Sequence, residues 1–157
     1  MRRLRYNTGV RNLTRHTRLH PGSLIYPLFV RVGENIRHEI GSMPGQFQLS
    51  IDQLVVEAKE AYDLGLGGII LFGIPDQKDC QGSDALHSEG IVQQAVAEVK
   101  DAVPDLLVLT DLCMCEYTDH GHCGILHERA GFTDVSNDPT LEYLGSHVHR
   151  LSTQDTT

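Results

Sequence analysis

The sequence predicts an α/β fold in which parallel strands alternate with helices. Three short apolar runs, at residues 24–30, 69–72 and 106–111, are separated by two amphipathic segments at 51–64 and 92–103. The chain of 157 residues, 40% of them hydrophobic, suits one domain with a sizeable core. A closed eight-stranded barrel takes about 250 residues. The sequence therefore predicts either an open sheet or the front part of a larger fold.

The three apolar runs are predicted as strands. Residues 24–30 are rich in β-formers, although Pro27 weakens this prediction because proline cannot donate a ladder hydrogen bond. Residues 69–72 are apolar on both faces, which is typical of a strand covered by helices on each side. Residues 106–111 are predicted as a third buried strand.

The first helix is predicted over residues 51–64, where apolar residues recur at helical intervals. Ser50 precedes Gln53 by three residues, which is the spacing of a capping box. Gly65 is expected to end this helix.

Two further helices follow from similar signals. The apolar spacing over residues 92–103 predicts a helix that Pro104 ends. Asn137 or Asp138 is expected to cap another helix, with Pro139 in its first turn.

The charge of the chain is unevenly distributed. Residues 1–20 carry six arginines and no acid, whereas the remaining residues carry a net charge of −14. This basic arm lacks lysine and is followed by an acidic body, so we expect it to contact an acidic partner chain and not nucleic acid.

Membrane association and secretion are not expected. No apolar run approaches the roughly 20 residues that a membrane helix needs, and the arm has no apolar signal core. The sequence therefore predicts a cytoplasmic protein. In that reducing compartment, cysteines act as metal ligands or bystanders more often than as disulfides.

Three cysteines lie within eleven residues, just after the third predicted strand. Cys113 and Cys115 would point to the same side of an extended segment, and a turn could bring Cys123 beside them. Three thiolates match a zinc site with one open position, and His120 or His122 could close it as a fourth ligand. These residues therefore predict a zinc site.

Two residues near this cluster are less specific. Asp111 ends the third predicted strand and could be either a site acid or a loop cap. Cys80 stands alone in a polar loop and is interpreted as a bystander.

Several stretches resemble the porphobilinogen synthase family, whose members are also called 5-aminolevulinate dehydratases. The similarity runs from residue 1 to about residue 145, and residues 110–124 are its most specific part. Further similar stretches are Arg2-Arg3-Leu4-Arg5, Ser42-Met43-Pro44-Gly45 and Leu71-Phe72-Gly73-Ile74-Pro75.

The resemblance implies a (β/α)₈ barrel with an extended N-terminal arm that wraps a neighbouring subunit in a homo-oligomer, commonly an octamer. Members of the family condense two molecules of 5-aminolevulinate into porphobilinogen with loss of water. In zinc-dependent members, cysteines matching Cys113, Cys115 and Cys123 hold the zinc. The aspartate matching Asp111 lines the substrate site.

The chain departs from the family pattern in its lysines. The family uses two lysines on later barrel strands to form Schiff bases with its substrates. Neither Lys59, Lys78 nor Lys100 matches them. The chain alone is therefore expected to be inactive, and the alternative function is a non-enzymatic zinc-binding module.

The family pattern also stops near residue 145. Leu144, Val148 and Leu151 could continue the last helix, or residues 146–157 could be an unrelated or frame-shifted tail of a truncated enzyme. The expected division is an arm over 1–22, a partial barrel over 23–145 and the tail over 146–157.

Overall fold

The computed structural model describes residues 2–129 and 131–152. Its body is a five-stranded sheet in the order β2-β3-β1-β4-β5. The sheet strands are β1 (Ile25–Arg31), β2 (Arg37–Glu39), β3 (Phe47–Leu49), β4 (Gly68–Ile74) and β5 (Val108–Thr110). The helices are α1 (Thr8–Leu13), α2 (Ile51–Asp63), α3 (Ile91–Ala102) and α4 (Asn137–Ser152). A separate hairpin pairs β6 (Leu126–Arg129) with β7 (Phe132–Val135).

The three predicted strands form one parallel unit. β4 lies between β1 and β5, with Leu28 opposite Leu71 and Ile70 opposite Leu109. The prediction that the third strand is buried is wrong, since β5 is only three residues long and half-buried. It occupies the sheet edge among the described strands, where Leu107 beside it is 56% exposed.

Pro27 lies inside β1 without interrupting it. β3 pairs with β1 only at Phe29 and Val30, so at Pro27 the strand has a paired neighbour only in β4. One side of β1 is therefore unpaired at Pro27, which is the position in a sheet that proline tolerates because it has no N–H to donate.

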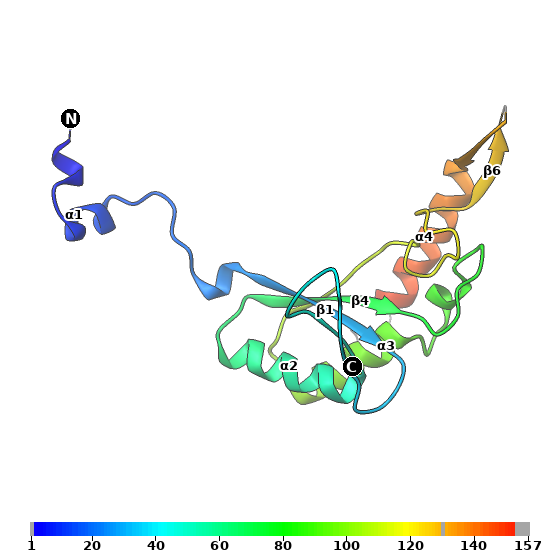
Figure 1. The fold of residues 1–157 in the computed structure, drawn as a ribbon, viewed down its shortest axis with the longest axis horizontal. Coiled ribbons are helices and arrows are strands. Elements are labelled where there is room, and N and C mark those ends of the chain that lie inside the picture. Colours follow the sequence, from blue (N-terminus) through cyan, green and yellow to red (C-terminus); the bar gives the residue numbers. More distant parts are fainter. Residues whose placement is uncertain (1, 130, 153–157) are drawn as a thin grey trace.

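Both central helices lie on the same face of the sheet, as Figure 1 shows for α2 and α3. Leu28 of β1 and Ile69 and Leu71 of β4 are buried in one core with apolar side chains of these two helices. Over the residues that the structure describes, the expectation that helices cover β4 on each side is therefore not met. The other face carries the half-buried rings of Phe29 and Phe72, which stack with their centroids 5.4 Å apart.

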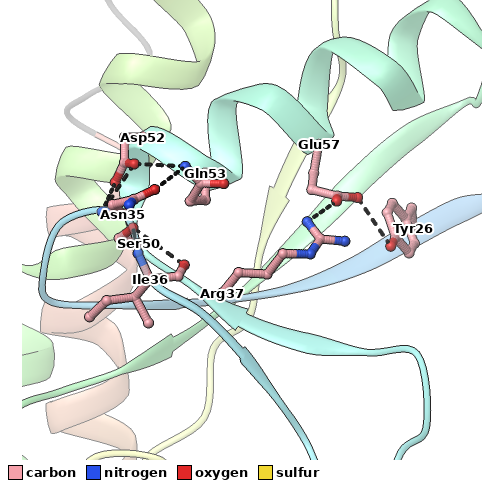
Figure 2. Close-up of polar contacts among 8 residues, drawn as sticks. All are labelled: Tyr26, Asn35, Ile36, Arg37, Ser50, Asp52, Gln53 and Glu57. Carbon is pink, nitrogen blue, oxygen red and sulfur yellow. Dashed lines mark hydrogen bonds and ion pairs between the residues drawn. The ribbon is translucent and has the colours of Figure 1, made fainter.

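The segment that contains β2 and β3, residues 32–50, was not predicted as strands. Its side chains contact α2 (Figure 2). Arg37 of β2 forms an ion pair with Glu57 of α2, and the hydroxyl of Tyr26 donates to the same carboxylate at 3.5 Å. The Arg37 guanidinium also lies 4.1 Å from the centre of the Phe47 ring. Contacts between residues distant in sequence thus hold this segment against α2.

α2 begins after Ser50, as predicted, but the capping-box hydrogen bond is not made. Ser50 Oγ instead accepts from the backbone N–H of Ile36 at 2.8 Å, and the Gln53 amide donates to Asn35 Oδ1 at 3.2 Å (Figure 2). The side chains that would cap the helix bind the preceding loop. Gly65 follows the helix with φ of 73°, the left-handed conformation expected of a glycine at this end.

α3 and α4 form where they were predicted, within two residues of the expected bounds. α3 ends two residues before Pro104, and α4 begins at Asn137 with Pro139 in its first turn. The expected boundary near residue 145 falls inside α4, which continues to Ser152, and Leu151 packs against the core. Residues 153–157 of the expected tail lie outside the described residues, and the three-part division stays a prediction.

The N-terminal arm extends away from the body in Figure 1. It contains α1, which the sequence did not predict, and Asn7 Oδ1 caps that helix by accepting from Val10 N at 2.9 Å. α1 buries no side chain, and Tyr6, Leu13 and Leu19 are each at least 80% exposed. Over the described residues, no helix is both long and apolar enough to cross a bilayer.

Candidate metal centre

The three predicted zinc ligands come together in the loop that follows β5. The sulfur of Cys113 lies 3.1 Å from that of Cys115 and 3.0 Å from that of Cys123. All three sulfurs lie within 4.8 Å of one another. The carboxyl end of a parallel strand is where α/β proteins build their sites. The donor atoms thus converge as the spacing of the cysteines predicts.

The chemistry of these thiols suits a divalent cation. Burial raises the pKa of Cys113 and of Cys115 above the ordinary thiol value, and hydrogen bonds from neighbouring thiols add to the effect at Cys115. Thiols crowded in this way remain protonated at neutral pH unless a cation replaces their protons. Three sulfur donors are a set that Zn²⁺ binds well, so the residues fit a zinc ion.

The loop after β5 that carries the three cysteines, residues 111–124, is called the cysteine loop below. Met114 packs inside it and holds it in place. Its side chain is fully buried, and its carbonyl accepts hydrogen bonds from Tyr117 N and Thr118 N, both at 2.9 Å. Burial of a side chain between two ligands fixes the outward direction of both neighbours. Thr118 Oγ1 then donates to the carbonyl of His122 at 3.0 Å, which brings the chain back toward Cys123.

The loop after β4 supports the cysteine loop from one side. Asp79 forms a parallel bridge with Thr118, and the Asp79 carbonyl accepts from Asp119 N at 3.1 Å. The Asp79 carboxylate accepts from Ser83 Oγ at 2.6 Å and from two backbone N–H groups, and these hydrogen bonds lower its pKa. The sequence analysis missed this role. The sequence feature that could have revealed it is an acid four residues before a serine, with Gly82 between them in a left-handed turn.

α4 supports the site from another side. Its Thr140 Oγ1 accepts from Ile125 N at 3.0 Å, and the Tyr143 hydroxyl donates to the carbonyl of Gly82 at 2.6 Å. His147 is 1% exposed and meets the ring of Tyr117 edge to face, with centroids 6.0 Å apart. Sequence reasoning singled out none of these contacts, because they join segments far apart in the chain.

Asp111 lies at the entrance to the cysteine loop. Its backbone N–H donates to Leu71 O at 3.2 Å, and its carboxylate lies within 4.8 Å of donor atoms on Cys113 and Glu116. Burial, and then the charge of Glu116, raise the pKa of Asp111. Glu116 in turn accepts a hydrogen bond from Cys115 Sγ at 3.1 Å. Asp111 thus lies beside the donor atoms, and its role as a site acid stays a prediction.

Neither candidate histidine joins the cysteines among the described donor groups. His120 Nδ1 accepts from His122 N at 3.1 Å, and His120 Nε2 lies 3.2 Å from the carbonyl of Cys80. Both ring nitrogens of His120 are thereby engaged elsewhere, with the proton on Nε2. Cys80 itself is exposed and forms no disulfide, and its interpretation as a bystander stays a prediction.

Comparisons with known proteins identify the family. The family model described as delta-aminolevulinic acid dehydratase matches residues 1–152. The chain belongs to the delta-aminolevulinic acid dehydratase family. Relatives of that name include one from Halalkalibacterium halodurans, 51% identical over 143 residues, and one from Synechococcus elongatus, 54% identical over 143 residues. Each of these matches covers 91% of this chain.

A solved structure of the family shares the fold. The delta-aminolevulinic acid dehydratase (porphobilinogen synthase) from Toxoplasma gondii ME49, in complex with the reaction product porphobilinogen, matches with a TM-score of 0.90. It is 35% identical, and the match covers 98% of this chain and 43% of that chain. The prediction of a partial barrel is confirmed, because the five described sheet strands remain open.

The match in length is also partial for the sequence relatives. The chain spans 42% of the Halalkalibacterium relative and 44% of the Synechococcus relative. The residues that match the family model include all three cysteines of the cluster.

Acid should destabilise this fold through His147. Burial lowers the pKa of His147 below its ordinary value of 6.5. The unfolded chain therefore binds a proton more readily than the folded one. The contribution of His147 to the free energy of unfolding is thus complete above about pH 6.5 and decreases as the pH falls below it.

Thermal unfolding between pH 5 and 8 should show a smaller dependence on pH for His147→Gln. The exposed His16 gives the matched control, His16→Gln, which should behave as the wild type does. Equal pH dependence in all three proteins would contradict this role.

Proposed function

We propose that this chain is the metal-binding part of a zinc-dependent porphobilinogen synthase that condenses two molecules of 5-aminolevulinate. The convergence of three cysteine sulfurs at the carboxyl end of β5 carries the proposal. The family membership of residues 1–152 supports it, as does the similarity to a porphobilinogen synthase that binds its product.

In this proposal, Cys113, Cys115 and Cys123 hold Zn²⁺, which when bound supplies a Lewis acid for the substrate carbonyl. Asp111 lies next to these donors and contacts 5-aminolevulinate. From this position its carboxyl can hydrogen-bond the substrate and orient it.

We propose that the lysines that form Schiff bases with the substrates lie outside residues 1–157. A Schiff-base lysine must be desolvated to be reactive at neutral pH. Lys59 and Lys78 are exposed, and Lys100 donates to the carbonyls of Pro104 and Leu106, at the opposite end of β5 from the cysteine loop. We therefore expect the chain alone to form no porphobilinogen and no imine that borohydride can trap.

A chimaera tests the proposal directly. Residues 1–145 would replace the matching part of the Halalkalibacterium relative, whose remaining sequence supplies the rest of the barrel. We expect the chimaera to form porphobilinogen and to lose this activity on Cys123→Ser, but not on Cys80→Ser. A folded chimaera that is inactive, or one that is unaffected by Cys123→Ser, would contradict the proposed function.

We also propose that the arm, residues 1–22, associates with a second copy of the chain in the cytoplasm. Its six arginines suit pairing with carboxylates, and its exposed Leu13 and Leu19 have no cover in one chain. The four cysteines are unpaired, which suits a reducing compartment.

Removal of residues 1–20 should lower the oligomeric state. Salt should weaken association of the intact chain more than that of the deleted one, because the Debye length falls to about 3 Å at 1 M salt. Light scattering of both proteins at low and high salt measures this. Identical masses under all conditions would show that the arm has no role in assembly.

A further inference from the structure

A polar hollow lies in the loop between β4 and α3, outside the metal centre. Its volume is about 260 Å³. Pockets that bind drug-sized ligands measure about 300–1,000 Å³, so this hollow suits a smaller molecule. The residues that line it are Gln77, Lys78, Asp79, Ser83, Asp84 and His87.

The lining carries hydrogen-bond donors that the fold does not use. Among the described residues, no hydrogen bond or ion pair engages the Lys78 ammonium or the Gln77 amide. His87 Nδ1 accepts from Glu89 N at 3.2 Å, which places the proton of the neutral ring on Nε2. The lining therefore offers one cation and two neutral groups that can donate to a carboxylate.

Two carboxylates also line the hollow, and one of them is already occupied. The Asp79 carboxylate accepts from Ser83 Oγ and from the backbone N–H groups of Gln81 and Ser83. Asp84 is half-buried, and its carboxylate has no hydrogen bond or ion pair with the described residues. One positive charge, on Lys78, and one negative charge, on Asp84, are thus left for a ligand.

Contacts with other elements hold the loop around the hollow in shape before any ligand binds. Asp79 forms a bridge with Thr118, and its carbonyl accepts from Asp119 N at 3.1 Å. Tyr143 of α4 donates to the carbonyl of Gly82 at 2.6 Å. A site that needs little ordering loses less free energy when it binds a ligand.

We propose that this hollow binds a small ω-amino acid in its zwitterionic form, with the carboxylate at Lys78 and the amine at Asp84. The two charges of such a ligand match the two that the lining leaves unpaired. Lys78 and Asp84 are not ion-paired with each other, so a ligand can lie between them. The hollow is also larger than an amino acid with both groups on one carbon would fill.

The proposal has a consequence for the substrate. 5-Aminolevulinate is an ω-amino acid, so the hollow would hold a substrate molecule outside the metal centre. This consequence alone rests on the function proposed above.

Calorimetric titration of the metal-free 157-residue chain with 5-aminopentanoate tests the proposal. This probe has both charged groups but lacks the carbonyl on which a Lewis acid would act. We expect one equivalent to bind, and 5-aminolevulinate to bind with similar affinity. Pentanoate lacks the amine and pentylamine lacks the carboxylate, so each should bind at least about ten-fold more weakly.

Three single substitutions locate the ligand, with circular dichroism to confirm folding. Lys78→Gln and Asp84→Asn each remove one of the two charges, so each should weaken 5-aminopentanoate binding at least about ten-fold. Lys59→Gln is the matched control, because Lys59 is an exposed lysine of α2 that does not line the hollow. It should bind the probe as the wild type does.

Several results would overturn the inference. They are the absence of 5-aminopentanoate binding, equal binding by Lys78→Gln and Lys59→Gln, and binding of pentanoate as tight as that of 5-aminopentanoate. Loss of binding in Asp111→Asn but not in Lys78→Gln would place the ligand in the metal centre instead. None of these measurements involves metal or turnover, so the inference can fail while the proposed function stands.

Discussion

Replacing Cys113 by serine should abolish tight zinc binding by the chain. The Cys113 sulfur is the centre of the cluster, since it lies 3.1 Å and 3.0 Å from the other two sulfurs. Serine cannot supply a thiolate, and loss of a supporting residue around a metal already lowers affinity about 10- to 100-fold. Loss of a direct ligand should exceed the upper end of that range.

Competition with a chromophoric zinc chelator measures this change. Cys80→Ser is the matched control, because Cys80 is a free, exposed cysteine outside the donor groups. We expect Cys80→Ser to keep the wild-type affinity. Zinc bound equally by Cys113→Ser and Cys80→Ser would show that the cluster is not the site.

Replacing Gly73 by alanine should destabilise the fold and weaken the metal centre together. A Cβ at Gly73 would lie 2.5 Å from Val92 Cγ2 and 2.6 Å from the hydroxyl oxygen of Tyr117. Overpacking of this kind costs about 1–3 kcal/mol of unfolding free energy. Tyr117 follows Cys115 by two residues, so its displacement moves the cysteine loop. Chemical unfolding and zinc competition of the same protein measure both effects.

Two further variants examine the cause. Gly73→Ala combined with Tyr117→Phe removes one of the two clashes and should recover part of the zinc affinity. Gly145→Ala is the matched control in α4, where an added Cβ meets no atom within 4 Å. It should be neutral or stabilising by about 0.5–1 kcal/mol, because alanine favours helix more than glycine does. Equal stability of Gly73→Ala and the wild type would contradict the predicted clash.

The elements with strong periodic signals could be predicted from the sequence, and those defined by tertiary pairing could not. α2 and α3 show helical spacing of apolar residues, and β1 and β4 are apolar runs with turn signals on both sides. β2 and β3 are three residues long, and their pairing depends on contacts such as that between Arg37 and Glu57. The β6–β7 hairpin is largely exposed, so burial leaves little pattern in its sequence.

The site likewise has a part that the sequence predicts and a part that it does not. Cys113, Cys115 and Cys123 are close in sequence, so their convergence followed from local spacing and a turn. The supports from Asp79 and Tyr143 lie at least 20 residues from the nearest cysteine of the cluster, and one sequence carries no sign of those contacts. The capping-box hydrogen bond expected of Ser50 is absent for the same reason, because Ile36, in the loop before β2, donates its backbone N–H to the Ser50 hydroxyl.

The order of the supporting contacts along the chain has a consequence for protein synthesis. Asp79 and the cysteine loop leave the ribosome before α4, which supplies Tyr143 and His147. The nascent chain therefore exposes its three thiols before α4 can pack against the loop. A metal ion captured at that moment would hold the loop in shape before α4 packs against it.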